Sequence, residues 1–174
     1  MTTEPTTYTL DQFFSDTRAT IRNKGVPSGL AEIREHLEKL LRNPELLKKH
    51  LGDPVPYAER TTIGHDPETD VHVLVHGRPK ASKSSVHDHG PCWVVYGNYK
   101  NPTRMRRWRR LDDGSKPGFA ELELQKEFLN EPGQAAVFAK GPPPGCFLAL
   151  QGWRQRPSTA ILGADRNARK EVDQ

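Results

Sequence analysis

Two histidines separated by one residue, His87 and His89, are the clearest candidates for chemistry in this sequence. In an extended strand, residues two apart point to the same face, so both imidazoles can present a nitrogen to one metal ion. Asp88 would then point away from that ion. The same spacing also occurs on solvated strand faces, and two imidazoles alone hold a divalent metal weakly. A tight site therefore requires a third donor from another segment.

The remaining histidines are weaker candidates for metal ligands. His72 and His76 share one face of a segment whose other face carries three valines. Since the valine face is expected in the core, the two histidines are expected to face solvent. The other three are expected to be surface residues on helices or in a loop, namely His36, His50 and His65.

The first third of the chain, residues 1–52, is predicted to be helical. Thr9 and Gln12 form a capping-box pattern at the start of one helix, and Gly25 is expected to end it. A second helix is expected from about Ser28, because leucine and isoleucine then recur at spacings of three, four and seven. A third, short helix is expected with Asn43 as its N-cap.

From about residue 60 the hydrophobic period changes from 3.6 to 2, and turn residues recur between short runs of β-branched and aromatic residues. We therefore predict a mainly β region over 60–163, folded as an antiparallel sandwich or barrel with the helices outside, and a polar tail over 165–174. The whole chain is expected to be one domain. The expected strands are 60–64, 70–77, 83–89, 92–99, 103–111, 119–129, 134–139, 146–151 and 157–163.

The composition narrows the function classes. The chain has 174 residues, of which 34% are hydrophobic, and a mean hydropathy of -0.78. Its apolar runs are too short to span a bilayer and no secretory signal is visible, so we expect a cytoplasmic protein that does not enter membranes. Two cysteines, Cys92 and Cys146, are too few for a disulfide framework, and we expect both as thiols.

The positive charge is concentrated in one segment. The net charge is +4, and residues 104–110 hold five arginines but only one aromatic residue, Trp108. Single-strand nucleic-acid platforms interleave aromatic and basic side chains. The pattern therefore favours a solvated strand face over a nucleic-acid partner, although salt-sensitive RNA binding stays as a weaker alternative.

The order of the segments resembles the cupin superfamily, and most closely the bacterial proteins similar to cysteine dioxygenase. A hydrophobic run at 71–75 is followed by Ser-Ser-Val-His-Asp-His-Gly at 84–90, Trp-Val-Val-Tyr-Gly at 93–97 and Pro-Gly-Gln-Ala at 132–135. The resemblance covers nearly the whole chain, including the helical first third. It implies a cupin double-stranded β-helix, a jelly-roll barrel, with about three helices packed outside it.

That resemblance also implies a reaction and the residues for it. In such proteins three histidines hold one non-haem Fe(II), and both atoms of O₂ are transferred to a thiolate to give a sulfinate. By this carry-over His87 and His89 are the first two ligands. Arg60 lies near the place of an arginine that binds the substrate carboxylate. Tyr96 and Trp93 lie on opposite faces of their strand, and one of them should point into the barrel, where Tyr96 is the candidate catalytic residue.

The sequence departs from the family pattern at the third ligand. No histidine follows His89, and the expected position falls on or near Pro144, within Gly-Pro-Pro-Pro-Gly at 141–145. Cys146 lies close to this position, and a set of two histidines and one cysteine suits zinc or iron. The competing interpretation of Cys146 is a small residue buried in a strand.

Two functions follow as expectations. The first is a metal-dependent oxygenase acting on a small molecule, with Fe(II), or zinc as the alternative. The second is a metal-free cupin module that binds a small anionic ligand. Edge strands of such barrels can pair, so a homodimer is also expected as an option.

Overall fold

The computed structural model describes residues 7–26, 28–56, 60–77, 85–87, 89 and 92–139, together with the backbone of 146–151. Its first helix, α1 (Leu10–Lys24), begins at the predicted capping box. The Thr9 hydroxyl accepts from the backbone N–H of Gln12 at 3.2 Å, and the Gln12 side chain accepts from the Thr9 N–H at 2.8 Å. Gly25 ends the helix with a φ of 67°, a conformation that glycine adopts without steric cost. Both predicted ends are confirmed.

The second and third helices are α2 (Leu30–Leu41) and α3 (Leu46–Leu51). The apolar stripe of α2 is buried as its spacing predicts. Asn43 caps the turn before α3 rather than the helix itself. Its side-chain oxygen accepts from the Glu45 N–H at 2.9 Å, and its amide donates to the Tyr8 carbonyl at 3.0 Å. Helix α3 thus begins at Leu46, two residues later than its sequence predicts.

The described strands form one mixed five-stranded sheet and one antiparallel hairpin. The sheet has the order β1-β2-β7-β3-β6, and β7 runs parallel to both of its neighbours while the other pairs are antiparallel. Its strands are β1 (Thr61–Asp66), β2 (Val71–Val75), β3 (Trp93–Asn98), β6 (Ala135–Phe138) and β7 (Cys146–Gln151). The hairpin consists of β4 (Thr103–Arg110) and β5 (Leu122–Asn130).

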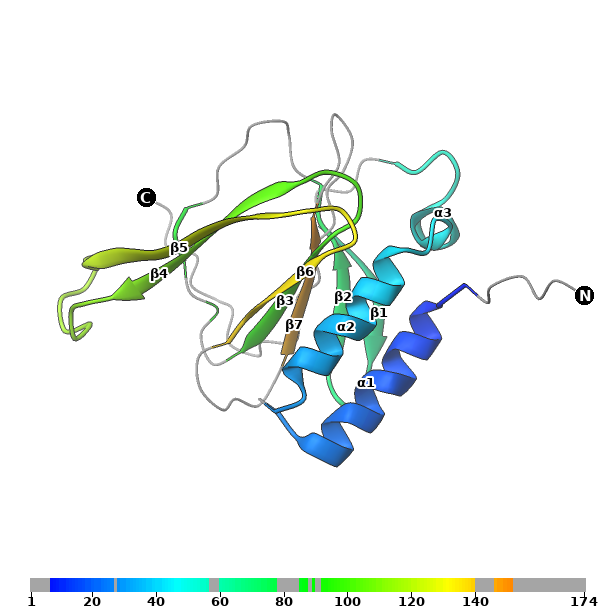
Figure 1. The fold of residues 1–174 in the computed structure, drawn as a ribbon, viewed down its shortest axis with the longest axis horizontal. Helices are drawn as coiled ribbons and strands as arrows, with labels where there is room; N and C mark the ends of the chain where they lie inside the picture. The colour runs from blue at the N-terminus through cyan, green and yellow to red at the C-terminus, as the bar shows by residue number, and fades with distance from the viewer. Residues whose placement is uncertain are drawn as a thin grey trace, which may run out of the picture.

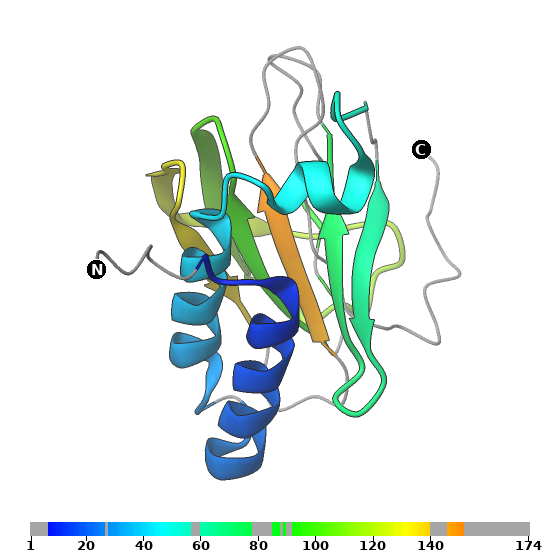
Figure 2. The ribbon, with the colours of Figure 1, turned by 90° about the vertical axis from the view of Figure 1, so that its right-hand side faces the viewer.

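Helices α1 and α2 lie against one face of the five-stranded sheet (Figure 1, Figure 2). The core between these layers combines the apolar stripes of both helices with alternate residues of the strands. Trp93 is completely buried there, as are Phe13 and Leu37. Val71 and Val73 also lie in this core, as the valine pattern predicts. Among the described residues no helix is long and apolar enough to cross a bilayer.

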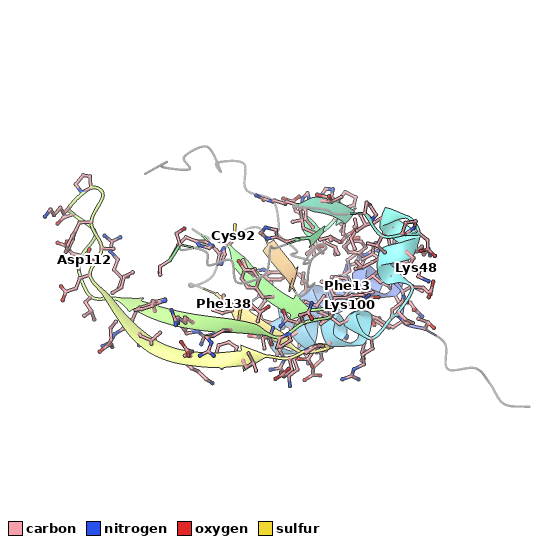
Figure 3. All side chains as sticks on the ribbon, turned by 90° about the horizontal axis from the view of Figure 1, so that it is seen from above. Phe13, Lys48, Cys92, Lys100, Asp112 and Phe138 are labelled. Atoms are coloured by element: carbon pink, nitrogen blue, oxygen red, sulfur yellow. The ribbon has the colours of Figure 1, made fainter. Side chains whose placement is uncertain are left out.

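The β4–β5 hairpin extends away from the helices, with Asp112 near its tip (Figure 3). Two buried asparagines tie the base of this hairpin to the sheet. Asn98 donates its side-chain amide to the Asn130 carbonyl, and Asn130 donates to the Tyr96 carbonyl at 3.1 Å. Both side chains are almost completely buried, and each bond satisfies an amide N–H where water does not reach, while Oδ1 of Asn98 is buried without a hydrogen-bond partner among the described residues.

Several predictions for the β region and the tail need correction or fall outside the described residues. The expected strand at 83–89 is wrong for its described residues, because 85–87 and 89 lie outside any strand. The strands that the structure describes form an open mixed sheet and a hairpin rather than a closed antiparallel barrel, because β1 and β6 are unpaired edges of the sheet and β7 runs parallel to β2 and β3. The strand expected at 157–163 and the tail at 165–174 lie outside the described residues.

Candidate functional site

The two faces of β3 have different environments. Trp93 and Val95 face the helices and belong to the main core, whereas Val94 and Tyr96 form a smaller cluster on the opposite face. The alternation of a strand therefore decides which of the two aromatic residues of β3 lies outside the helix-covered core. It is Tyr96, with 9% of its surface exposed.

Tyr96 lies beside His89, one of the two candidate metal ligands. Its hydroxyl is 3.1 Å from Nε2 of His89, and the two ring centroids are 5.6 Å apart. The rings of His87 and His89 lie 5.0 Å apart in an edge-to-face arrangement. We call these three residues the histidine–tyrosine site. Tyr96 lies within β3, whereas His89 precedes this strand and is tied to its start by the Cys92 N–H, which donates to the His89 carbonyl at 3.2 Å.

The backbone fixes the orientation of the His87 ring. Its Nδ1 lies 2.9 Å from the Ser85 carbonyl, and a carbonyl can only accept, so Nδ1 carries the proton in this contact. In the neutral ring Nε2 is then the nitrogen with an available lone pair. This is the arrangement by which an outer hydrogen bond prepares a histidine to bind a metal.

A cationic side chain lies at the other end of the Tyr96 cluster. The Phe138 ring packs against Tyr96 at 5.5 Å, and the Arg107 guanidinium lies over Phe138 at 5.2 Å. Arg107 also donates to the Val137 carbonyl at 2.8 Å. In the sequence Arg107 is one of five arginines in a run predicted to be solvated. Its contacts with Val137 and Phe138 of β6 distinguish it from the other four.

The other two predicted site residues lie on different parts of the sheet. Cys146 begins β7, and its backbone is paired with Trp93 at the start of β3; nothing is described of its side chain. Arg60 is exposed and directly precedes β1. Because β2 and β7 separate β1 from β3, these strands lie about 14 Å apart at the usual strand spacing. The structure thus brings Tyr96 to the histidine pair but does not bring Arg60 there.

A second histidine cluster, which the sequence analysis missed, lies on the β1–β2 hairpin. His65 and His72 are register partners across the two strands, and their rings stack at 3.9 Å. Asp70 reaches both, with its Oδ1 at 3.0 Å from Nε2 of His65 and 3.4 Å from Nε2 of His72. Burial and the neighbouring His65 lower the pKa of His72, although Asp70 opposes this shift. The signal in the sequence was the pair of histidines flanking a turn, which a hairpin places opposite each other.

Two histidine placements differ from the sequence predictions. His36 is buried, not a surface residue, because it packs between α1 and α2. His65 lies in β1 rather than on a helix or in a loop, although it is exposed as predicted. The cause is the same in both cases, since neither helix pairing nor strand register can be read from local spacing.

The described residues complete a three-donor set at only one of the two clusters. Among them, a group of three donor side chains that lie close enough to share an ion is formed by His65, Asp70 and His72. His87 and His89 provide two donors. The family's third position at Pro144 lies outside the described residues, as does the side chain of Cys146. Comparison with protein-family models and with curated proteins finds no match for this chain.

Proposed function

We propose that this chain is a cupin-type, cysteine dioxygenase-like protein that acts on a small molecule at the histidine–tyrosine site with a bound metal ion. The observation that carries the proposal is the contact of His89 with Tyr96 beside His87, on the face of β3 that the helices leave uncovered. The order of the sequence segments, which resembles that of cupins, supports the cupin fold in this proposal. The exposure of His87 gives a solute access to the site.

The residues fit a metal in part. His87 offers Nε2, because its Nδ1–H is bound to the Ser85 carbonyl. His89 offers a second ring, and Cys146 stays the third donor that the sequence suggests, although its register partners Trp93 and Val71 belong to the core on the opposite face of the sheet from Tyr96. Fe(II) in such a site would supply O₂ activation, and zinc would supply a Lewis acid. The Tyr96 hydroxyl, 3.1 Å from Nε2 of His89, is placed to donate a hydrogen bond to a group bound beside that ring.

The first test is the metal content of protein purified without an affinity tag. We expect close to one iron or zinc per chain at this site, lost in His87→Ala/His89→Ala. The matched control is His65→Ala/His72→Ala, which removes two histidines elsewhere and should keep this metal. Because two imidazoles without a third donor bind weakly, Cys146→Ala should lose at least about tenfold in affinity. Metal far below one per chain, unchanged in the first variant, would refute the proposal.

If the metal is present, the oxygenase reaction has its own measurement. Thiol-dependent O₂ uptake should occur in the iron-loaded wild type and be absent in His87→Ala/His89→Ala. We expect Tyr96→Phe to retain the metal and to lower the rate about 10²-fold, because it removes one positioned hydroxyl and leaves the ring packing against Phe138. A Tyr96→Phe rate equal to that of the wild type would exclude a catalytic role for this hydroxyl.

A metal-free binding module is the second candidate, and one arrangement favours it. Arg107, Phe138 and Tyr96 form a row of contacts that ends at His89, so a guanidinium, a phenol and an imidazole lie along one face. Such donors suit a small anion. Thermal stabilisation of metal-free protein by inorganic phosphate, reduced in Arg107→Gln but not in Arg104→Gln, would support this function over the oxygenase. No stabilisation by phosphate would count against it.

A further inference from the structure

The β1–β2 hairpin carries a cluster of donor atoms that the proposed function does not use. His65 near the end of β1 and His72 near the start of β2 are opposite each other, and Asp70 closes the turn between the strands. All three present one ligand atom each, and these atoms lie within 4.8 Å of one another. The three side chains are partly exposed, so a metal ion from solvent can reach them.

The distances agree with the dimensions of a tetrahedral site. Zinc binds imidazole nitrogen and carboxylate oxygen at close to 2.1 Å, which places neighbouring ligand atoms about 3.4 Å apart in a tetrahedron. The observed separations from Oδ1 of Asp70 are 3.0 Å to His65 and 3.4 Å to His72. The two rings stack with an interplanar angle of 24°, so at least one of them must rotate out of the stack for both Nε2 lone pairs to meet at one ion, and solvent exposure leaves room for this rotation and for a water ligand.

The surrounding contacts hold Asp70 in place. Asp66, buried at the end of β1, accepts from the Thr69 hydroxyl at 2.5 Å and from the Thr69 N–H at 3.3 Å. Asp70 itself has a φ of 55°, in the left-handed region that Asp and Asn tolerate better than most residues. The nearby Glu68 pairs with Arg18 and Arg22, so its carboxylate is already neutralised by cations.

We propose that His65, Asp70 and His72 form a divalent-metal site suited to Zn²⁺, distinct from the histidine–tyrosine site. Two neutral imidazoles and one carboxylate are ligands that zinc accepts, and the open fourth position gives the site room for water or an anion. The proposal is independent of the proposed function, because it uses other residues on other strands. The alternative is that both rings only donate N–H hydrogen bonds to Asp70 and bind no metal. The experiment below distinguishes this alternative from a zinc site.

The test is isothermal titration calorimetry, in which Zn²⁺ is titrated into the full chain. It is carried out on the wild type and on the His87→Ala/His89→Ala variant, which serves as the background protein. We expect one equivalent of zinc to bind in the background protein. Either His65→Ala or His72→Ala should weaken this binding at least about tenfold, because a two-donor site remains. The matched control is His50→Ala, which removes a histidine from α3 and should leave the titration unchanged.

Asp70→Asn provides a variant that keeps the turn. Asparagine adopts the same left-handed conformation, so the hairpin should fold while the charged donor is lost. We expect at least about a tenfold loss of zinc affinity in this variant as well. Binding of Co²⁺ should give the visible absorption of a tetrahedral centre in the background protein and not in Asp70→Asn. The proposal is overturned if the background protein binds no zinc, or if these three substitutions leave its affinity unchanged.

Discussion

His36 shows how a buried histidine can be held neutral. The Thr20 hydroxyl donates to Oε1 of Glu32 at 3.0 Å, so its oxygen accepts from Nε2–H of His36 at 3.2 Å. Nδ1 is buried without a hydrogen-bond partner among the described residues, with Oδ2 of Asp16 4.0 Å away. Burial, helped by Lys39, lowers the pKa of His36 below its usual value, while Asp16, Glu32 and Glu35 oppose the shift.

This lowered pKa predicts a loss of stability in mild acid. The unfolded chain binds a proton near pH 6.5 while the folded chain does not, so the free energy of unfolding falls as pH drops below that value, until the folded pKa is passed. His36→Gln should flatten the dependence by at most about 1.4 kcal/mol per pH unit. The measurement is urea unfolding between about pH 7 and pH 5.

The comparison with His36→Gln isolates one histidine from two others. Burial also lowers the pKa of His50 and of His72, so the wild type titrates several groups in the same pH range. Both remain in the variant, and the difference between the two proteins reports His36 alone. Equal pH dependence in the two proteins would show that His36 is not kept neutral by folding.

At the scale of secondary-structure elements, a single glycine sets how closely α1 approaches β1. A Cβ added at Gly64 would lie 2.8 Å from a ring carbon of Phe14 and 2.9 Å from a methyl carbon of Leu10. Both side chains are buried in the main core, so they have little room to move away. Gly64 also lies at the irregularity in the pairing of β1 with β2.

We therefore expect Gly64→Ala to lower the free energy of unfolding by about 1–3 kcal/mol, the usual cost of overpacking a core. Urea unfolding measures it. Thr62→Ala, at an exposed position of the same strand, is the matched control and should change stability by less than about 0.5 kcal/mol. If Gly64→Ala is as stable as the control, α1 does not depend on this close approach.

These elements show which parts of the fold local sequence predicts. The capping box of α1, the stripe of α2 and the valine face of β2 were predictable, because each depends on residues within a few positions of one another. The parallel insertion of β7 was not, since strand pairing between distant segments leaves no local period. Residues 87 and 89 were predicted as part of a strand but lie outside any strand, because their local spacing does not reveal whether a pairing partner exists.

In the candidate sites, too, features that depend on neighbouring residues were predictable and features that depend on distant segments were not. The His-x-His spacing indicated a shared position for His87 and His89, and their rings are indeed neighbours. Their contact with Tyr96, however, depends on which face of β3 the helices cover. The cluster of His65, Asp70 and His72 depends on the register of a hairpin, which local spacing in the sequence does not determine.

For the whole molecule, the arginine-rich β4–β5 hairpin decides how strongly the basic charge acts on partners. Each of its five arginines contacts an acceptor on the same hairpin or on β6. Arg104 and Arg106 pair with Glu127, Arg109 pairs with Glu123, Arg110 pairs with Asp112, and Arg107 bonds to the Val137 carbonyl. Exposed pairs of this kind add at most about 1 kcal/mol of stability each, but they reduce the positive potential of the surface.

We therefore expect wild-type protein to bind single-stranded RNA weakly, with no saturable binding at about 0.15 M salt. Removing the two paired carboxylates in Glu123→Gln/Glu127→Gln should raise the affinity at low salt about tenfold, and added salt should abolish the gain. Fluorescence anisotropy of a labelled oligonucleotide measures both. The matched control is Glu35→Gln/Glu45→Gln, which makes the same change of charge at an exposed position of α2 and at the exposed N-cap of α3.

The control distinguishes a local effect from a general one. If the binding is set by the hairpin, only the hairpin variant gains affinity, because the released guanidinium groups lie along β4. If net charge alone matters, both variants gain equally, since each loses two carboxylates. Tight wild-type binding with a steep loss in salt would instead show that the paired arginines still reach phosphate, and the chain would then be an RNA-associated protein in addition to any activity at the histidine–tyrosine site.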